Sequence, residues 1–273
     1  MEWVGRWPTS WDGHLALVYD DEDQRRAGVA AWVRRGLDVA AKILYTEPAQ
    51  EPPERSFVAL LEEHGIGVDA AVERGQLQVF PASAQAYSPA WQASVVEEAL
   101  ASGYPSVRWS GEAATAWGVM SPAAHADIEQ ATDGLCDSGA VSVLCQYPSD
   151  LSPTTWQTVV RTHRGGVTDS LLRVSQVLGG LGLTGEVDAS NVQTLSALLM
   201  AIGAWLAGTD LVLDLGGLTF MDLAGVRAVL GATAAHRGRG GRVRLQAPQQ
   251  QVARVLAGMG VDTSTGCRIE GAP

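Results

Sequence analysis

Short apolar runs alternate with longer amphipathic segments along the first two thirds of the chain. The apolar runs predict strands at residues 14–19, 42–45, 77–80, 107–109 and 141–145. The segments between and after them predict helices at residues 20–37, 57–64, 91–101, 122–137 and 153–163. Strands that alternate with helices at this spacing are typical of a parallel sheet with helices on both faces.

The pattern begins again after the segment Arg164-Gly-Gly-Val167. Apolar runs predict further strands at residues 171–175, 181–187, 211–215 and 242–246. The longer segments between and after these runs predict helices at residues 189–207, 226–236 and 249–259. We therefore predict two α/β units, residues 1–167 and 168–273.

One corner of the second unit has an unusual pattern. In LDLGGLTFMDLAGVRAVL, residues 213–230, a buried strand leads through the loop Phe220–Gly225 into a helix. An acid just before small residues at a helix N-terminus is where a regulatory phosphate could lie. Ala224, which precedes the glycine, has no hydroxyl to carry a phosphate.

The helix at residues 192–207 is apolar on nearly every side, with Leu195, Leu198, Leu199, Ile202 and Trp205 on one stripe and mainly alanines opposite. A helix of this kind is buried on more than one side. We expect one side to pack on its own sheet and the other to meet the first unit or another subunit.

Charge supports the two-unit interpretation and excludes one class of partner. The chain has 30 acidic and 19 basic residues, a net charge of −11. All of this excess lies in residues 1–168, whereas residues 169–273 are neutral. A nucleic-acid-binding surface needs basic residues, so we predict no nucleic-acid partner.

The remaining composition predicts a cytoplasmic protein without a cofactor. The first residues contain no apolar signal segment, and Leu195–Ala207 is too short to span a membrane. The three cysteines fit no metal or disulfide spacing and are expected to be reduced, buried thiols. The five histidines form no i, i+4 pair, so we predict no metal site.

The second unit resembles the STAS domain of bacterial anti-anti-sigma factors. The resemblance rests on Leu183-Thr-Gly-Glu-Val-Asp188, on Leu211–Gly225 and on the last strand and helix. It implies a small α/β domain that docks on a kinase-like anti-sigma factor. The family usually has Ser or Thr directly before the loop glycine, and phosphorylation there breaks the complex. Because that position is Ala224 here, the resemblance implies a docking surface without its covalent switch.

The residues assigned to this docking surface are the six of the loop: Phe220, Met221, Asp222, Leu223, Ala224 and Gly225. An alternative interpretation is that Ala224 and Gly225 are small only because the helix start packs closely.

The first unit resembles the DcmR sensory (MEDS) domain. The resemblance rests on His14–Asp20, Arg35-Gly-Leu37, Gly75-Gln-Leu77, Arg108-Trp109 and Cys145-Gln-Tyr147, with His163 downstream. It implies a RecA-like sheet and the sensing of small, often hydrocarbon-like ligands. A RecA-like ATPase needs a Gly- and Lys-containing phosphate loop after its first strand. Here Asp20-Asp-Glu-Asp23 follows that strand, so we predict neither ATP binding nor enzymatic activity.

Eight of the nine tryptophans lie in the first unit: Trp3, Trp7, Trp11, Trp32, Trp91, Trp109, Trp117 and Trp156. Such side chains can line an apolar pocket, although ordinary core packing is the alternative. Trp109 and Trp117 lie close to Arg108 and Glu112 in the sequence, near the end of a strand. Our candidate ligand-binding residues are His14, Trp109, Trp117 and Tyr147.

Together these features predict an anti-sigma factor antagonist with a fused small-molecule sensory domain. The alternative is a STAS-based oligomeric signalling scaffold without an anti-sigma partner. Either protein could form a homodimer.

Overall fold

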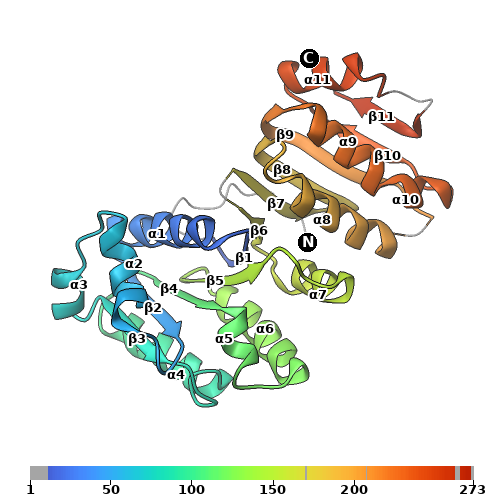
Figure 1. The fold of residues 1–273 in the computed structure, drawn as a ribbon. Helices are drawn as coiled ribbons and strands as arrows, with labels where there is room; N and C mark the ends of the chain where they lie inside the picture. Colours follow the sequence, from blue (N-terminus) through green and yellow to red (C-terminus); the bar gives the residue numbers. More distant parts are fainter. Residues whose placement is uncertain (1–11, 170, 207, 262–264, 272–273) are drawn as a thin grey trace. The chain divides into compact units, whose positions relative to one another are not determined.

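The computed structural model describes residues 12–169, 171–206, 208–261 and 265–271. The chain falls into two compact units, Met1–Pro148 and Ser149–Pro273. Each unit is an α/β fold, which confirms the predicted fold class (Figure 1). The predicted boundary, after residue 167, lies beyond this division, because the helix that precedes it packs within the second compact unit.

The first unit is built on a parallel sheet of five strands in the order β1-β5-β4-β2-β3. Its strands are β1 (His14–Tyr19), β2 (Lys42–Glu47), β3 (Leu77–Pro81), β4 (Val107–Glu112) and β5 (Val141–Pro148). Each strand contains one of the apolar runs that predicted it, and most extend a few residues further at their carboxyl ends.

Helices cover both faces of this sheet. They are α1 (Glu22–Asp38), the short η1 (Pro53–Arg55), α2 (Phe57–Glu63), α3 (Asp69–Glu73), α4 (Pro89–Ala101), α5 (Ala113–Trp117) and α6 (Pro122–Cys136). The sequence did not predict α3 and α5, which are each five residues long. Asp21 caps α1 by accepting a hydrogen bond from the Gln24 amide, as the acidic run predicts.

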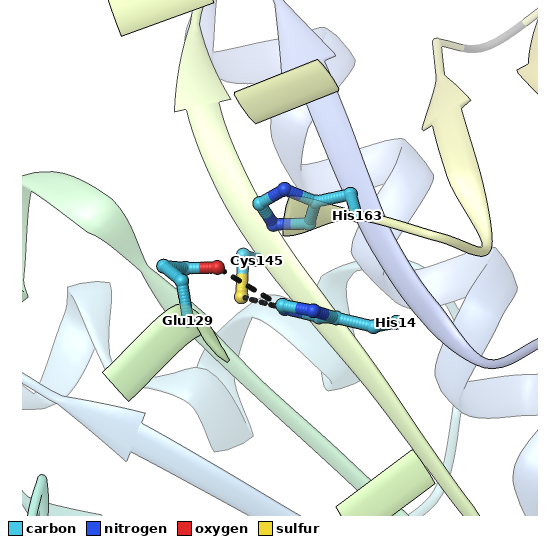
Figure 2. Close-up of side chains that lie close together, drawn as sticks. All are labelled: His14, Glu129, Cys145 and His163. Carbon is cyan, nitrogen blue, oxygen red and sulfur yellow. Dashed lines mark hydrogen bonds and ion pairs between the residues drawn. The ribbon is translucent and has the colours of Figure 1, made fainter. Parts of the chain in front are cut away.

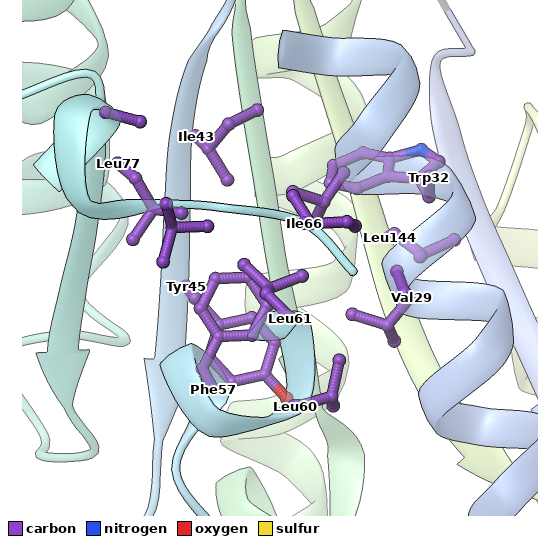
Figure 3. Packing of buried hydrophobic residues seen from close by; sticks show 14 of the residues in the cluster. Val29, Trp32, Ile43, Tyr45, Phe57, Leu60, Leu61, Ile66, Leu77 and Leu144 are labelled. Carbon is purple, nitrogen blue, oxygen red and sulfur yellow. The ribbon is translucent and has the colours of Figure 1, made fainter. Parts of the chain in front are cut away.

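The alternation of strand side chains separates two apolar cores. Ile43 and Tyr45 pack against α1 and α2, where the Tyr45 and Phe57 rings stack at 3.8 Å (Figure 3). Leu44, between them, packs on the other face with Trp109 and with Val96 of α4. Apolar side chains therefore pack on both faces of the sheet, as is typical of buried parallel sheets.

The second unit has a mixed sheet in the order β6-β7-β8-β9-β10-β11. The strands are β6 (Gly166–Thr168), β7 (Leu172–Val177), β8 (Gly180–Val187), β9 (Leu211–Met221), β10 (Val243–Gln246) and β11 (Cys267–Glu270). The pairs β6–β7 and β7–β8 are antiparallel, and the others are parallel. The short strands β6 and β11 were not predicted.

The helices of the second unit are α7 (Pro153–Thr162), α8 (Val192–Trp205), α9 (Leu223–Ala232), α10 (Ala234–Gly238) and α11 (Gln250–Gly258). The apolar helix α8 packs against both α9 and α7. One buried side of α8 therefore faces α9 and another faces α7. The sequence pattern places α7 in the first unit, whereas it belongs to the second compact unit. Within the described part of the chain, no helix has the length and apolarity needed to cross a membrane.

Candidate functional site

A group of fully or partly buried polar side chains lies inside the first unit. His14 comes from β1, Glu129 from α6 and Cys145 from β5, and Figure 2 shows them converging. Nε2 of His14 lies 3.1 Å from Oε2 of Glu129 and 3.4 Å from Sγ of Cys145. His14 and Glu129 are 0% and 3% exposed, so this polar contact is shielded from water.

The fold explains how these residues meet. Strands β1 and β5 are parallel neighbours, and Ala16 pairs with Cys145 in their register. On α6, residues His125, Glu129 and Asp133 follow one another at intervals of four, which places them on one face of the helix. That face looks toward the start of β1, where His14 lies.

A second layer of hydrogen bonds surrounds the three residues. Nδ1 of His14 lies 3.0 Å from Oδ1 of Asp133. The Tyr147 hydroxyl donates to Oε1 of Glu129 at 2.9 Å, and Nε2 of His125 lies 3.2 Å from the same oxygen. Both ring nitrogens of His14 and both oxygens of Glu129 are thus held in fixed directions.

The charges of the cluster favour a protonated imidazole. Burial acts to lower the pKa of His14, but Cys145 and the hydrogen bonds to Asp133 and Glu129 outweigh it, and the pKa lies well above its ordinary value. Burial also raises the pKa of Tyr147, and neighbouring Glu129 adds to the effect. Tyr147 is therefore a hydrogen-bond donor to Glu129 at neutral pH.

A small cavity of about 50 Å³ lies beside this cluster, lined by Glu129, Cys145, His125, Trp109 and largely apolar neighbours. One water needs roughly 10–15 Å³ of such volume, and a cavity of roughly 150 Å³ holds benzene. The cavity therefore suits a few waters or a ligand of only a few heavy atoms.

Of the four candidate ligand-binding residues, one lines the cavity, two contact Glu129 and the fourth, Trp117, lies farther out. Trp109 lines the cavity and donates its Nε1 hydrogen to Thr46 at 3.0 Å. His14 and Tyr147 contact Glu129 directly. Trp117 is 38% exposed, with its ring centroid 6.2 Å from that of Tyr147. Trp3, Trp7 and Trp11 lie outside the described residues.

Arg108 does not accompany Trp109 on this side of the sheet. Neighbouring strand residues point to opposite faces, so the Arg108 guanidinium lies over the Trp32 ring at 4.6 Å. It donates to the Trp32 carbonyl at 2.7 Å and pairs with Asp12. Arg108 therefore contacts α1 through Trp32, on the face of the sheet opposite the cavity.

Sequence reasoning missed Glu129, Asp133, His125 and the role of Cys145. A search for histidine pairs could not find them, because their partners are carboxylates and a thiol on other elements. The spacing of His125, Glu129 and Asp133 on one helix was the available signal. Cys145 was expected to be a buried thiol, but it is half-buried beside His14. Figure 2 also draws His163, which belongs to the second compact unit; its Nδ1 lies 2.8 Å from the Val159 carbonyl.

The predicted loop of the second unit is shorter than expected. Strand β9 continues to Met221 and α9 begins at Leu223, so only Asp222 lies between them. Asp222 caps the helix by accepting a hydrogen bond from the Gly225 amide at 2.8 Å. Phe220 and Leu223, on either side, are 45% and 52% exposed. The corner is therefore a tight, capped strand-to-helix turn that presents two apolar side chains.

Close packing leaves room only for glycine at position 225. A Cβ atom on Gly225 would lie 2.7 Å from Cγ1 of Val187 and 2.9 Å from Cγ of Met221. The Asp222 amide donates to the Val187 carbonyl at 3.1 Å. The end of the Leu183–Asp188 motif thus lies directly beside the corner, although the two motifs are distant in the sequence.

Two family models match consecutive parts of the chain. The family model of the methanogen/methylotroph DcmR sensory domain (MEDS) matches residues 13–164, and the Mlab STAS domain model matches residues 173–269. No match was found among curated proteins.

Solved structures with similarity to the chain include the anti-sigma factor antagonist SpoIIAA in its unphosphorylated form, at 22% identity and a TM-score of 0.30, covering 36% of this chain and 86% of that one. A candidate anti-sigma factor antagonist from Thermotoga maritima matches at 16% identity and a TM-score of 0.30, covering 36% and 85%. The flagellar accessory protein FlaH from Methanocaldococcus jannaschii matches at 10% identity and a TM-score of 0.42, covering 62% and 75%.

Proposed function

The chain belongs to the MEDS family through residues 13–164, and on that premise we propose that it is a regulator in which a small-molecule sensory domain is joined to a STAS domain that docks on a protein partner. The partner we propose is a kinase-like anti-sigma factor, which would make the protein an anti-sigma factor antagonist. The protein would then influence transcription by sequestering that factor, without catalysis of its own.

The corner at Asp222 is the observation that carries this proposal. Phe220 and Leu223 are large apolar side chains that remain about half exposed on either side of a helix cap. Exposed apolar side chains grouped around a charge are typical of a protein-docking surface. The same corner is where the STAS resemblance implies that the partner docks.

The absence of a hydroxyl at Ala224 determines the proposed form of regulation. Ala224 is the second residue of α9, and it is half-buried. A partner kinase could not phosphorylate this position, so phosphorylation of the STAS domain there would not release the kinase. We propose that the sensory domain, or simply the concentration of the protein, controls docking instead.

The cavity beside Glu129 supports the sensory half of the proposal. Its lining is mainly apolar, with Trp109, Ala116 and Ile128 among its walls. A site with apolar walls and a few polar groups is suited to a small, largely apolar molecule with one polar end.

A second candidate function is a STAS-based oligomeric scaffold. Met200 and Trp205 on α8 are 56% and 64% exposed, and Leu178 in the β7–β8 turn is 98% exposed. These side chains could be covered by further copies of the chain rather than by an anti-sigma factor.

Binding of the full chain to purified kinase-like anti-sigma factors from the same genome tests the proposal. Phe220→Ser and Leu223→Ser should each weaken the complex by about 10-fold or more, as expected for docking residues. Leu178→Ser, which lies in the same unit, is the matched control and should bind like wild type. Homo-oligomers by light scattering, without any anti-sigma complex, would favour the scaffold instead.

A further inference from the structure

The three converging side chains of the first unit are of the types that bind transition metals. His14 offers an imidazole nitrogen, Glu129 a carboxylate oxygen and Cys145 a thiol sulfur, and these atoms all lie within 4.8 Å of one another. They come from three different elements, so no sequence motif predicts that they lie together. From this geometry we infer a binding site for a divalent transition-metal ion of the zinc type, formed by Nε2 of His14, Oε2 of Glu129 and Sγ of Cys145.

The distances between these atoms fit tetrahedral coordination. With Zn–N and Zn–O bonds of about 2.0 Å and a Zn–S bond of about 2.3 Å, tetrahedral angles place N and O roughly 3.3 Å apart and N and S roughly 3.5 Å apart. The corresponding distances here are 3.1 Å and 3.4 Å. Binding of the ion would release the proton on Nε2 of His14 and the thiol proton of Cys145 to solvent, and small side-chain movements would then admit it.

The surrounding hydrogen bonds have the arrangement that orients metal ligands. Asp133 lies 3.0 Å from Nδ1 of His14, on the side of the ring away from the proposed ion. A carboxylate at this position fixes the tautomer and makes the imidazole a stronger ligand. Tyr147 and His125 hold Oε1 of Glu129, which leaves Oε2 directed at His14 and Cys145.

The mixed donor set selects the class of ion. Calcium and magnesium prefer oxygen ligands alone, whereas a nitrogen, an oxygen and a sulfur together favour zinc or a similar transition metal. These three ligands alone do not complete a tetrahedral shell. Two of them, Glu129 and Cys145, also border the cavity of about 50 Å³. If the proposed sensory function holds, the ion would supply the polar anchor for the sensed ligand.

Titration of the metal-free full chain with Co²⁺ tests the site. We expect one ion per chain, with a thiolate-to-cobalt charge-transfer band and displacement by Zn²⁺. Cys145→Ala should abolish the band and weaken binding by about 100-fold or more, because it removes a ligand that contacts the ion. Cys267→Ala, a buried cysteine on β11 of the other unit, is the matched control and should retain both.

Absence of stoichiometric binding to wild type, or a band that persists in Cys145→Ala, would overturn the assignment. If Cys145→Ala does not fold, alkylation of the wild type provides a second measurement. Zn²⁺ should then protect Cys145, identified by peptide mass, and unchanged alkylation would contradict the site. Neither measurement uses a sensory ligand or a protein partner, so failure of the metal site and failure of docking are distinguishable.

Discussion

Nδ1 of His14 lies 3.0 Å from Oδ1 of Asp133, although 119 positions separate the two residues in the chain. The contact joins the first residue of β1 to the last turns of α6. It fixes the plane of a fully buried imidazole ring and directs Nε2 at Glu129 and Cys145. Asp133 is therefore a positioning residue for the cluster.

Asp133→Asn should weaken the binding of Co²⁺ by about 10–100-fold, the usual effect of losing an outer-shell partner of a metal-ligating histidine. The charge-transfer band should keep its position, because the ligand atoms are unchanged. Asp127→Asn, at an exposed site on the same helix, is the control and should bind like wild type. Equal affinities in both variants would show that Asp133 does not position His14 for an ion.

Gly225→Ala should destabilise the protein by about 1–3 kcal/mol, the usual cost of overpacking. Its new methyl group would lie 2.7 Å from Val187 and 2.9 Å from Met221. Gly231→Ala, in the same helix and with no atom within 4 Å of its Cβ position, should instead be neutral or stabilise by up to about 1 kcal/mol. Urea unfolding measures both variants, and a lower midpoint for Gly231→Ala than for Gly225→Ala would contradict the packing argument.

Ala224→Ser should make the STAS corner a substrate for a kinase-like anti-sigma partner. A phosphate there would add nearly two negative charges at the proposed docking surface, beside Asp222, and should release the partner. Incubation with the kinase and ATP, followed by intact mass, should find one added phosphate on the variant. Wild type is the control, since Thr219, the nearby hydroxyl, already donates to the Gly185 carbonyl. Phosphate on the wild-type corner would refute this prediction.

Trp109→Phe should reduce the fluorescence response to a cavity-sized ligand, with short alcohols from methanol to butanol as probes. Trp109 lines the cavity, and loss of its hydrogen bond to Thr46 should cost about 1–2 kcal/mol of stability. Phenylalanine is preferable to alanine, because truncating a buried tryptophan costs about 3–5 kcal/mol. Trp91→Phe is the control, since Trp91 contacts the Trp109 ring at 5.9 Å and does not line the cavity. An undiminished response in Trp109→Phe would place the ligand elsewhere.

Acid should remove a small part of the stability through Glu22. Its hydrogen bonds with Arg25, followed by the attraction of that charge, hold the pKa of Glu22 below its ordinary value. A carboxylate with a depressed folded-state pKa contributes stability above its unfolded pKa, and this contribution is lost as pH falls through the folded pKa.

The stability difference between wild type and Glu22→Gln should therefore shrink as pH falls from about 6 to about 3, and it should not exceed about 1 kcal/mol because Glu22 is exposed. Urea midpoints across this range measure the difference, with exposed Asp23→Asn in the same helical turn as the control. A difference that stays constant with pH would contradict the role of this pair.

The sequence by itself determined the elements and the fold class. Apolar runs such as His14–Tyr19 coincide with buried strands, and the acidic cap at Asp21 begins α1. These features are local, because strand alternation, helical spacing and caps involve residues within a few positions of one another. The STAS motif around Asp222 was likewise readable, since its cap and its glycine are three residues apart.

The tertiary structure alone decided where the chemistry lies. His14, Glu129 and Cys145 belong to three elements, and only the adjacency of β1 and β5 beneath α6 brings their ligand atoms together. Arg108 is a different case, because alternation along β4 already places it opposite Trp109, and only the tertiary structure shows that its face packs on Trp32 of α1. Hydrophobic periodicity and helix capping depend on residues that are close in the sequence. A binding site depends on distances between distant segments, and these distances are set only when the sheet forms.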